Sequence, residues 1–419
     1  MRQLKILILS DYAFIKGGAE KVAITSSIGL VKRGHEVVFF SGVGPICEEL
    51  KKVSFKDIIC LNQKDILDNP NRFNAVLSGI YNWQAVKRLK KLLSEWIPDI
   101  VHIHSVSKSL SWAPINAIYS HNIPIVYTLH DYGLICPNLG IYNFKTNKNC
   151  KYYKPACMLK CLLTDCDKKN FAQKLWRWLR YFVTRYFFKV NKKIDAYIAV
   201  SNFVGKMVKE NLASNKPFKV VYNPIERVKV KSRKVVGEPY KNKIKFLFVG
   251  RLSLEKGIDI LLEAMEQVDA KLVVIGDGEL IGICKEKSKK IGRDKVNILG
   301  YQNMEVVKDQ MLKSHALILP SKCMEPAPLV IGEASYNLLP SIVADHGGLT
   351  EFVSDGRNGL YFKAGNISSL IQVMNKAIKN RGLLVQLGKE AGRLAEKKDF
   401  SVSRHISEIE AIYKNILDK

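Results

Sequence analysis

The chain has 419 residues, of which 47% are hydrophobic and 25% are charged. It is long enough for two or three globular domains and too apolar for a disordered or collagen-like protein. Lysine and arginine number 66 against 39 acidic residues, a formal net charge of +27, which predicts a polyanionic partner. The candidates are nucleic acid, an anionic membrane surface and phosphorylated substrates.

The first apolar run, residues 6–9, is too short for a signal peptide, and no stretch approaches the roughly 18 apolar residues of a membrane-spanning helix. We therefore expect a cytoplasmic protein, and peripheral binding to the inner face of the cytoplasmic membrane fits this expectation. Nine cysteines in such a chain are expected to be reduced thiols or metal ligands rather than a disulfide framework.

Short apolar runs separated by helical lengths recur along the first half of the chain. They lie at 5–9, 37–40, 100–103, 124–129, 195–200 and 219–221. Residues 18–33 predict a helix between the first two runs. Continuous apolar strands are typical of a parallel sheet covered by helices on both faces. Residues 1–222 are therefore predicted to form a Rossmann-like domain.

Residues 223–243 are rich in Lys, Arg and Pro and predict a linker. A second series of apolar runs follows at 244–249, 271–275, 296–299, 316–319, 341–344 and 360–362. It predicts a second Rossmann-like domain over 244–402, and the apolar residues of 403–419 have the spacing of a helix that packs back on the first domain. The fold class is thus α/β, with two doubly wound domains facing a central cleft. Ligands of such sheets bind beyond the carboxyl ends of the strands, so the cleft is the expected active site.

Charged and glycine residues follow the first two strands of the second domain. Arg251 and Lys256 lie between the first strand and a predicted helix, whose N-terminal N–H groups and dipole favour anions. Together they could neutralise a diphosphate without a metal, although solvated loop charges would give the same pattern. Gly276, in a Gly-Asp-Gly turn after the second strand, allows a close backbone approach to a ligand.

Two glutamates lie eight residues apart after the strand at 316–319. Pro328 suits the first turn of a helix, so Glu325 is expected in the preceding loop and Glu333 on the helix itself. Carboxylates accept paired hydroxyls, so the two could hold a sugar and a ribose of one nucleotide. Taken alone, either residue could instead be a helix cap or an ordinary surface group.

These segments resemble retaining glycosyltransferase family four, the group 1 glycosyltransferases, whose signature is Glu-x7-Glu and whose members share the GT-B fold. The resemblance covers nearly the whole chain in order, spacing and strand context. Further matching segments are Gly17-Gly18-Ala19-Glu20, Leu129-His130-Asp131, Lys256-Gly257 and Gly347-Gly348-Leu349-Thr350-Glu351. Two departures stand at Pro326-Ala327-Pro328, where members often carry Gly or Phe after the first Glu, and at Leu338, where a Gly is common.

The resemblance implies a nucleotide-sugar-dependent hexosyltransferase that works with retention and without a cofactor. Its donor would be a UDP- or GDP-sugar. The residues expected in the donor site are Gly17, Gly18, Arg251, Lys256, Gly276, Glu325, Leu329, Val330 and Glu333. Arg251 and Lys256 would hold the diphosphate, Glu325 the sugar hydroxyls and Glu333 the ribose. His130 would lie beside the reacting sugar, although a strand-end histidine with a structural partner is the alternative.

The same resemblance implies the synthesis of a bacterial surface polysaccharide, such as a lipopolysaccharide O-antigen or a capsule. The basic aromatic segment at 168–193, if it binds a membrane, would hold the enzyme near a lipid-linked saccharide acceptor. The first domain would be the acceptor side. Metal dependence is not expected, because no Asp-x-Asp lies at a strand end to hold a cation with the diphosphate.

An insertion between the strands at 124–129 and 195–200 carries clustered cysteines. Cys150, Cys157, Cys161 and Cys166 could supply four thiolates to a zinc ion. The spacing lacks Cys-x2-Cys pairs, which favours reduced structural thiols instead.

The same insertion contains nine Lys or Arg and no acid over residues 168–193. On a helix, one face would carry Phe171, Leu175, Trp178, Leu179, Phe182 and Tyr186. This pattern predicts an interfacial helix on an anionic membrane. A core helix with a solvated basic face is the alternative.

Three other functions compete with this hypothesis. The net charge would suit a nucleic-acid-binding protein, but no known nucleic-acid-binding module is present, so no nucleic acid partner is expected. A dinucleotide-dependent oxidoreductase would need Gly-x-Gly-x-x-Gly after the first strand, which is absent. A soluble transferase of the same fold that acts on a free acceptor would not need the basic aromatic helix.

Overall fold

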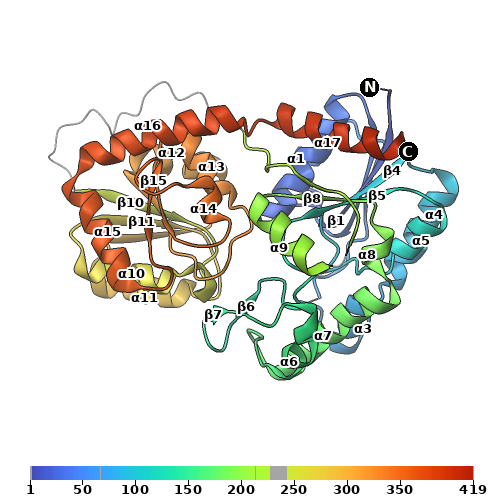
Figure 1. Ribbon diagram of the computed structural model, residues 1–419, viewed down its shortest axis with the longest axis horizontal. Coiled ribbons are helices and arrows are strands. Elements are labelled where there is room, and N and C mark those ends of the chain that lie inside the picture. The colour runs from blue at the N-terminus through green and yellow to red at the C-terminus, as the bar shows by residue number, and fades with distance from the viewer. Residues whose placement is uncertain (1, 67, 213, 227–242, 419) are drawn as a thin grey trace. The chain divides into compact units, whose positions relative to one another are not determined.

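The computed structural model describes residues 2–66, 68–212, 214–226 and 243–418. The chain divides into two compact units (Figure 1). The first comprises Met1–Ile141, Lys151–Pro224 and Ser401–Lys419, and the second Tyr142–Cys150 and Ile225–Phe400. Most of the predicted linker, 223–243, lies outside the described residues. The sequence analysis assigned residues 142–150 to the first domain, whereas they pack with the second unit.

The first unit is built on a parallel sheet of seven strands in the order β3-β2-β1-β4-β5-β8-β9. Its strands are β1 (Lys5–Tyr12), β2 (Glu36–Val43), β3 (Asp57–Cys60), β4 (Ile100–Ile103), β5 (Ile125–Leu129), β8 (Ala196–Ala199) and β9 (Phe218–Val220). Its helices are α1 (Gly18–Lys32), α2 (Glu48–Lys51), α3 (Arg72–Ile80), α4 (Trp83–Glu95), α5 (Ile115–Ser120), η1 (Pro155–Cys157), α6 (Met158–Leu163), α7 (Phe171–Phe182), η2 (Val183–Phe187), α8 (Val190–Lys193), α9 (Asn202–Leu212) and α17 (Val402–Leu417).

The central strands are buried on both faces, as their continuous apolar sequences predict. Every residue of β4, β5 and β8 is buried. The C-terminal helix α17 completes one face of this unit, because Ile406, Ile409, Ile412 and Tyr413 join the core formed by β1 and α1. It packs tightly on α1 at Gly29, where a Cβ would lie 2.6 Å from Cγ1 of Ile406.

The second unit has a parallel sheet of six strands in the order β12-β11-β10-β13-β14-β15. Its strands are β10 (Lys245–Val249), β11 (Lys271–Ile275), β12 (Val296–Gly300), β13 (Ala316–Leu319), β14 (Ser341–Ala344) and β15 (Gly359–Phe362), and a hairpin adds β6 (Tyr142–Asn143) and β7 (Lys148–Asn149). Its helices are η4 (Leu254–Lys256), α10 (Ile258–Gln267), α11 (Ile281–Ile291), α12 (Met304–Lys313), α13 (Leu329–Tyr336), α14 (Leu349–Phe352), α15 (Ile367–Lys379) and α16 (Arg381–Lys398).

Both sheets are doubly wound, with the strand order reversing beside the first strand of each unit. The reversal falls between β1 and β4 in the first unit and between β10 and β13 in the second. In such sheets the loops that follow the two strands diverge and leave room for a ligand at the carboxyl edge. The predicted α/β fold class is therefore confirmed, and each unit has one topological switch point where a site is expected.

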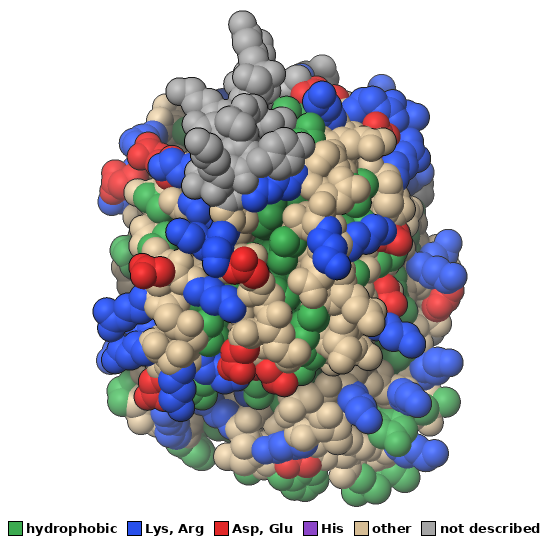
Figure 2. Space-filling view, turned by 90° about the vertical axis from the view of Figure 1, so that its left-hand side faces the viewer, with side chains coloured by type: hydrophobic (Ala, Val, Ile, Leu, Met, Phe, Trp, Pro, Cys, Tyr) green, Lys and Arg blue, Asp and Glu red, His purple; other side chains and the backbone are tan. Residues whose placement is uncertain are grey.

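The positive charge can be followed on one face of the molecule. Figure 2 shows one face, where Lys and Arg side chains are scattered with Asp and Glu among them rather than gathered in one stripe. Among the described residues, no helix combines the length and the apolar composition needed to cross a bilayer.

Candidate active site

Four loops at the carboxyl edge of the second sheet are joined into one layer by backbone hydrogen bonds. The loops after β10 and β11 are linked where Leu252 N donates to Asp277 O at 2.9 Å. The loops after β10 and β13 are linked where Lys322 N donates to Glu255 O at 2.8 Å. Gly348 N, after β14, donates to the carbonyl of Glu325 at 2.8 Å. The predicted donor-site segments therefore lie side by side, although up to about a hundred residues separate them in the sequence.

Two glycines make this close packing possible. Gly257 has φ +71°, and a Cβ there would lie 1.9 Å from the carbonyl oxygen of Pro320. Gly276 has φ +142°, and a Cβ there would lie 1.9 Å from the carbonyl oxygen of Gly250. Both contacts are far shorter than van der Waals distance, so the backbone of each loop can reach its neighbour only at glycine.

Lys256 and Glu325 form an ion pair at the centre of this layer. The Lys256 ammonium donates a hydrogen bond to Oε1 of Glu325. The Ser321 hydroxyl donates to the same oxygen at 2.6 Å. Glu325 is only 7% exposed, while the Lys256 side chain is 27% exposed. The structure thus brings together two residues that the sequence analysis assigned to different parts of the donor, the diphosphate and the sugar.

Electrostatics keep this pair ionised. Burial by itself would raise the pKa of Glu325, but the charge of Lys256 and the hydrogen bonds from Lys256 and Ser321 hold that pKa below its ordinary value. Burial would likewise lower the pKa of Lys256, and the charge of Glu325 outweighs it and raises the pKa. Arg251 adds positive charge, because it lowers the pKa values of both groups.

The site combines a buried carboxylate with cations that still have donors to offer. An ammonium has three N–H donors, and Lys256 gives one to Glu325. Arg251 is exposed at the end of β10. A ligand at this edge would therefore meet free cationic donors beside a carboxylate that is already held in place, which suits an anion linked to a group with hydroxyls.

The other predicted donor residues lie on α13, which starts as the sequence predicted. Pro328 immediately precedes the helix with φ −71°. Leu329 and Val330 form its first turn, Glu333 lies in its second turn, and all three are half-buried. Glu325 stands in the preceding loop. The arrangement of a loop glutamate and a helical glutamate is therefore the one predicted.

Sequence reasoning assigned no role to three residues that support this layer. Nε2 of His346 donates to the Ser321 carbonyl at 2.9 Å, and the Asn149 amide lies 3.3 Å from Nδ1 of the same ring. His346 therefore positions the residue that bonds to Glu325. Its place directly before Gly347 and Gly348 was the one signal in the sequence.

The carboxyl edge of the first sheet carries a pair of histidines, of which His104 is buried and His130 is half-buried. His104 follows β4 and His130 follows the neighbouring β5. Nδ1 of His104 lies 3.0 Å from Nε2 of His130. Burial lowers the pKa of His130 to about 3 and holds that of His104 well below its ordinary value, so both rings are neutral at physiological pH. The sequence analysis singled out His130 and missed His104.

The remaining first-unit candidates lie at the same edge. Gly17 and Gly18 stand at the start of α1, after the loop that follows β1. Asp131, which follows His130, closes a turn by accepting a hydrogen bond from Gly133 N at 2.8 Å. A small cavity beside Asp131 is lined in part by Arg180 of α7.

The structure gives the zinc hypothesis no support. All four candidate cysteines are described, and no group of three or more His, Cys, Asp or Glu side chains suited to a metal occurs in the described part of the chain. Cys150 belongs to the second unit, whereas Cys157, Cys161 and Cys166 belong to the first. The four cysteines are therefore divided between the two units, and none of them forms a disulfide.

Helix α7 is oriented with its basic face inward and its apolar face outward. Its cations find partners within the unit. Lys174 is fully buried and donates a hydrogen bond to Sγ of Cys161 at 3.5 Å. Arg177 forms an ion pair with Asp167 at 2.9 Å, and Arg180 donates a hydrogen bond to the Ser107 carbonyl at 2.5 Å. The exposed apolar side chains are Phe171 (40%), Leu175 (40%), Leu179 (45%), Tyr186 (45%) and Phe187 (71%). The alternative of a core helix with a solvated basic face is therefore wrong.

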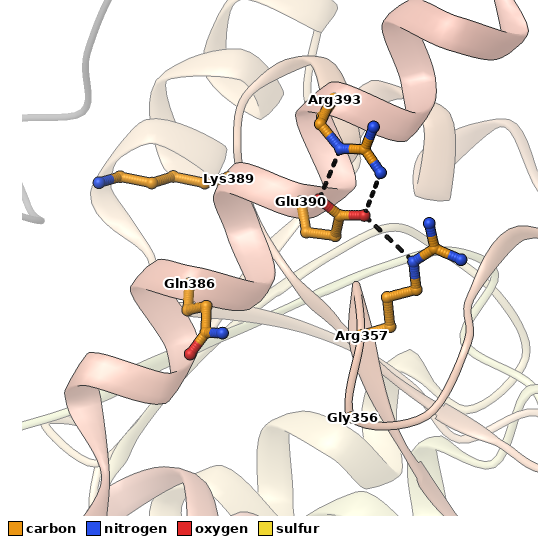
Figure 3. A pocket seen from close by; sticks show the side chains of 6 residues that line it. All are labelled: Gly356, Arg357, Gln386, Lys389, Glu390 and Arg393. Carbon is orange, nitrogen blue, oxygen red and sulfur yellow. Dashed lines mark hydrogen bonds and ion pairs between the residues drawn. The ribbon is translucent and has the colours of Figure 1, made fainter.

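A surface hollow of about 420 Å³ lies elsewhere on the second unit (Figure 3). Glu390 of α16 accepts from Arg357 at 3.1 Å and from Arg393 at 2.7 Å. These hydrogen bonds, foremost that of Arg393, lower the pKa of Glu390 to about 2. The hollow lies near Arg357, before β15, and so at the opposite edge of the sheet from the switch point. Its carboxylate is already paired with both arginines, and we assign it no ligand.

Comparison with solved structures identifies the fold, and family patterns identify the class. HepE of Anabaena, crystallised with UDP-glucose, superimposes with a TM-score of 0.69 at 18% identity over 99% of this chain and 100% of HepE. Two doubly wound sheets of this kind are the GT-B architecture. The patterns of "Glycosyltransferase Family 4" and "Glycosyl transferases group 1" match residues 16–228 and 230–394. The chain therefore belongs to glycosyltransferase family 4.

Relatives agree with this assignment. An uncharacterized glycosyltransferase of Methanocaldococcus jannaschii is 31% identical over 238 residues, 56% of this chain and 64% of the relative. An uncharacterized 42.6 kDa protein in the cps region of Klebsiella pneumoniae is 25% identical over 353 residues, 81% of this chain and 84% of the relative. The chain spans only half to two-thirds of the length of the Methanocaldococcus relatives.

Proposed function

We propose that this glycosyltransferase transfers a hexosyl group, with retention, from a UDP- or GDP-sugar to a lipid-linked saccharide during synthesis of a bacterial surface polysaccharide. The observation that carries the proposal is the Lys256–Glu325 pair at the switch point of the second sheet. A nucleotide sugar has a diphosphate next to a sugar with hydroxyls, and this pair offers a cation next to a carboxylate.

In the proposed reaction, the bond between the anomeric carbon and the diphosphate breaks while the acceptor hydroxyl attacks from the same face. Negative charge grows on the leaving diphosphate, and Arg251 and Lys256 would stabilise it. Preorganised donors of this kind contribute most when they are held in place before the reaction. The ion pair with Glu325 holds Lys256 in this way. Glu325 would bind the sugar hydroxyls, Glu333 the ribose, and Gly17, Gly18, Gly276, Leu329 and Val330 would line the donor.

The pathway is proposed from the relatives. The Klebsiella relative is named for its cps region, and HepE was crystallised with UDP-glucose. These names favour a nucleotide-sugar donor and a capsule-like or lipopolysaccharide product for this chain as well.

A nucleotide-sugar panel tests the donor assignment. A bound ligand raises the melting temperature by mass action, so one UDP- or GDP-sugar is expected to stabilise the wild type more than the others. Turnover of that donor with a lipid-linked acceptor, followed by NMR of the new linkage, reports the stereochemistry. An inverted linkage would rule out retention, and stabilisation by no member of the panel would contradict the donor assignment.

We also propose that the first unit docks on the cytoplasmic face of an anionic membrane. The docking surface comprises Phe73 of α3, Leu159 and Leu163 of α6, Leu175 and Leu179 of α7, and Phe187 of η2, all exposed. These helices are neighbours, since Trp176 of α7 donates to the Val76 carbonyl of α3 at 3.1 Å and Tyr186 lies 3.8 Å from Sδ of Met158. Contiguous exposed apolar side chains mark a surface that another apolar phase covers.

The charges that accompany this docking surface differ from those expected from the sequence. Lys174, Arg177 and Arg180 bond within the unit, so they contribute little to lipid binding. Exposed lysines occur in or next to the same helices in the sequence: Lys160 in α6, Lys168 and Lys169 ahead of α7, and Lys189 after η2. Each lysine near an anionic leaflet contributes about 1 kcal/mol, and each buried large aliphatic side chain about 1.5 kcal/mol or more. Apolar insertion and these lysines would therefore act together.

Flotation with vesicles tests the docking surface. The wild type is expected to float with vesicles that contain phosphatidylglycerol and less with neutral ones. Leu179→Glu should reduce binding about tenfold or more, because it replaces an inserted side chain by a charge. The matched control is Ile283→Glu, which changes an aliphatic residue of α11 that is 53% exposed on the other unit. Equal losses in both variants, or no binding of the wild type, would contradict membrane docking.

A further inference from the structure

The second histidine at the edge of the first sheet has no assigned role. His104 is 1% exposed and follows β4 directly, as His130 follows β5. Its backbone N–H donates to the Leu9 carbonyl at 2.9 Å, which fixes the start of the loop. The two rings are nearly parallel, with 22° between their planes and 5.3 Å between their centroids. A single hydrogen bond of 3.0 Å joins Nδ1 of His104 to Nε2 of His130.

The other nitrogen of His104, Nε2, determines which of the two rings carries the proton of this hydrogen bond. Nε2 of His104 is buried and has no hydrogen-bond partner within the described ranges. A proton on that nitrogen would make it a buried donor without an acceptor, and orphaned buried N–H groups are rare and unfavourable. A proton on Nδ1 instead leaves a bare lone pair at Nε2 and provides the donor for the bond to His130. Because burial keeps both rings neutral, one proton per ring has to be placed.

We propose that His104 is a positioning residue that makes His130 a hydrogen-bond donor to the ligand. When His104 Nδ1–H donates, Nε2 of His130 accepts, and the single proton of the His130 ring has to lie on Nδ1. No described residue is a partner of that Nδ1, and the ring is only half-buried. The ring therefore presents an N–H to an oxygen of a sugar or phosphate, and it has no lone pair there with which to act as a base.

The neighbouring histidine has a different role. Nδ1 of His102 pairs with the Tyr413 hydroxyl and Nε2 with the Thr128 hydroxyl, each at 2.7 Å. Both of its nitrogens are thus satisfied inside the core, although its ring lies 4.2 Å from that of His104. His102 tethers α17 to the sheet, whereas only His104 contacts the residue at the edge. Only the identity of the ligand that His130 faces rests on the proposed function.

NMR of the full chain labelled with 15N-histidine tests the proton position without any turnover. The signals of His130 are assigned by their loss in His130→Asn. In the wild type, Nδ1 of His130 is expected to be the protonated nitrogen and Nε2 the bare one. The reverse assignment would overturn the proposal, whatever reaction the protein catalyses. This measurement also stands if a His104 variant fails to fold.

A matched pair of variants tests whether the position of the His130 proton affects turnover. Asn and Leu have nearly the same shape, but only the amide of His104→Asn can donate to Nε2 of His130. His104→Asn is expected to keep the His130 tautomer and kcat within about threefold of the wild type. His104→Leu should lose the single tautomer and lower kcat roughly tenfold, with KM for the donor little changed. Equal kcat losses in both variants, with the tautomer unchanged in both, would mean that His104 has only a packing role. If no donor is turned over by the wild type, the proposed function fails while the tautomer result remains.

Discussion

Replacing Lys256 by Met should reverse the pH dependence of stability in the second unit. In the wild type, the depressed pKa of Glu325 stabilises the fold above its ordinary pKa near 4.5, and this contribution is lost as the pH falls through the folded value. In Lys256→Met, burial becomes the dominant influence and raises the pKa of Glu325. The variant then has a penalty that grows as the pH rises from about 4.5 towards 7.

The magnitude follows from the burial of the pair. Breaking a buried ion pair by removing one partner typically costs 3–5 kcal/mol. The Lys256 side chain is 27% exposed, so solvent screening reduces the expected loss to about 2 kcal/mol at pH 7. That loss corresponds to roughly thirtyfold faster amide exchange where exchange requires opening of the unit. At pH 5 the carboxyl is partly protonated, and the ratio should fall below about tenfold. Turnover should fall about a hundredfold at all pH values, since a preorganised donor is lost.

The assay has to observe the second unit by itself. All five tryptophans, at positions 83, 96, 112, 176 and 178, lie in the first unit, so their fluorescence reports only that unit. Hydrogen exchange of the β13 and β14 amides, measured by mass spectrometry as a ratio of variant to wild type at each pH, reports the second. The tryptophan transition should stay unchanged and serves as an internal control.

Two further variants sharpen this test. Lys313→Met removes an ion pair with Asp309 of similar chemistry, but both side chains are exposed and lie on α12, away from the carboxyl edge. It should change exchange less than threefold. The double variant with Glu325→Gln removes the buried charge, so its exchange ratio should no longer depend on pH. The reasoning would be refuted if Lys256→Met gave the same exchange ratio at pH 5 and pH 7.

Three other predictions follow from the described contacts. Gly257→Ala should slow turnover and destabilise the second unit, because its Cβ would lie 1.9 Å from the Pro320 carbonyl; a melting temperature equal to the wild type would show that the loops yield easily. Ile409→Ala truncates a fully buried residue of α17 and should lower the unfolding free energy of the first unit by about 2–5 kcal/mol. Urea titration monitored by tryptophan fluorescence measures this loss, and an unchanged midpoint would mean that α17 is not needed for that core. Turnover should persist in EDTA, since Arg251 and Lys256 can neutralise the diphosphate; loss of turnover that magnesium restores would contradict this assignment.

The sequence was sufficient for most strands of the two sheets and for the order of the site segments. Apolar runs placed β4, β11, β13 and β14 at their observed bounds, because a strand buried on both faces requires apolar residues throughout. The short β3 was not predicted, since its residues are only partly buried and their apolar run is brief. The family motifs predicted that Lys256 and Glu325 share one site, because each motif follows a strand and the carboxyl ends of parallel strands lie at one edge of the sheet.

Tertiary structure alone decided which groups touch and which face is outside. The sequence shows that α7 has a basic face and an apolar face. The orientation of the two faces depends on Cys161, Asp167 and Ser107, which lie on other segments and pair with the cations of α7. The direct contact of Lys256 with Glu325, and of His104 with His130, arises because parallel strands bring distant loops to one edge. Periodicity reports the pattern along one segment, whereas a contact also depends on the partner that the rest of the chain supplies.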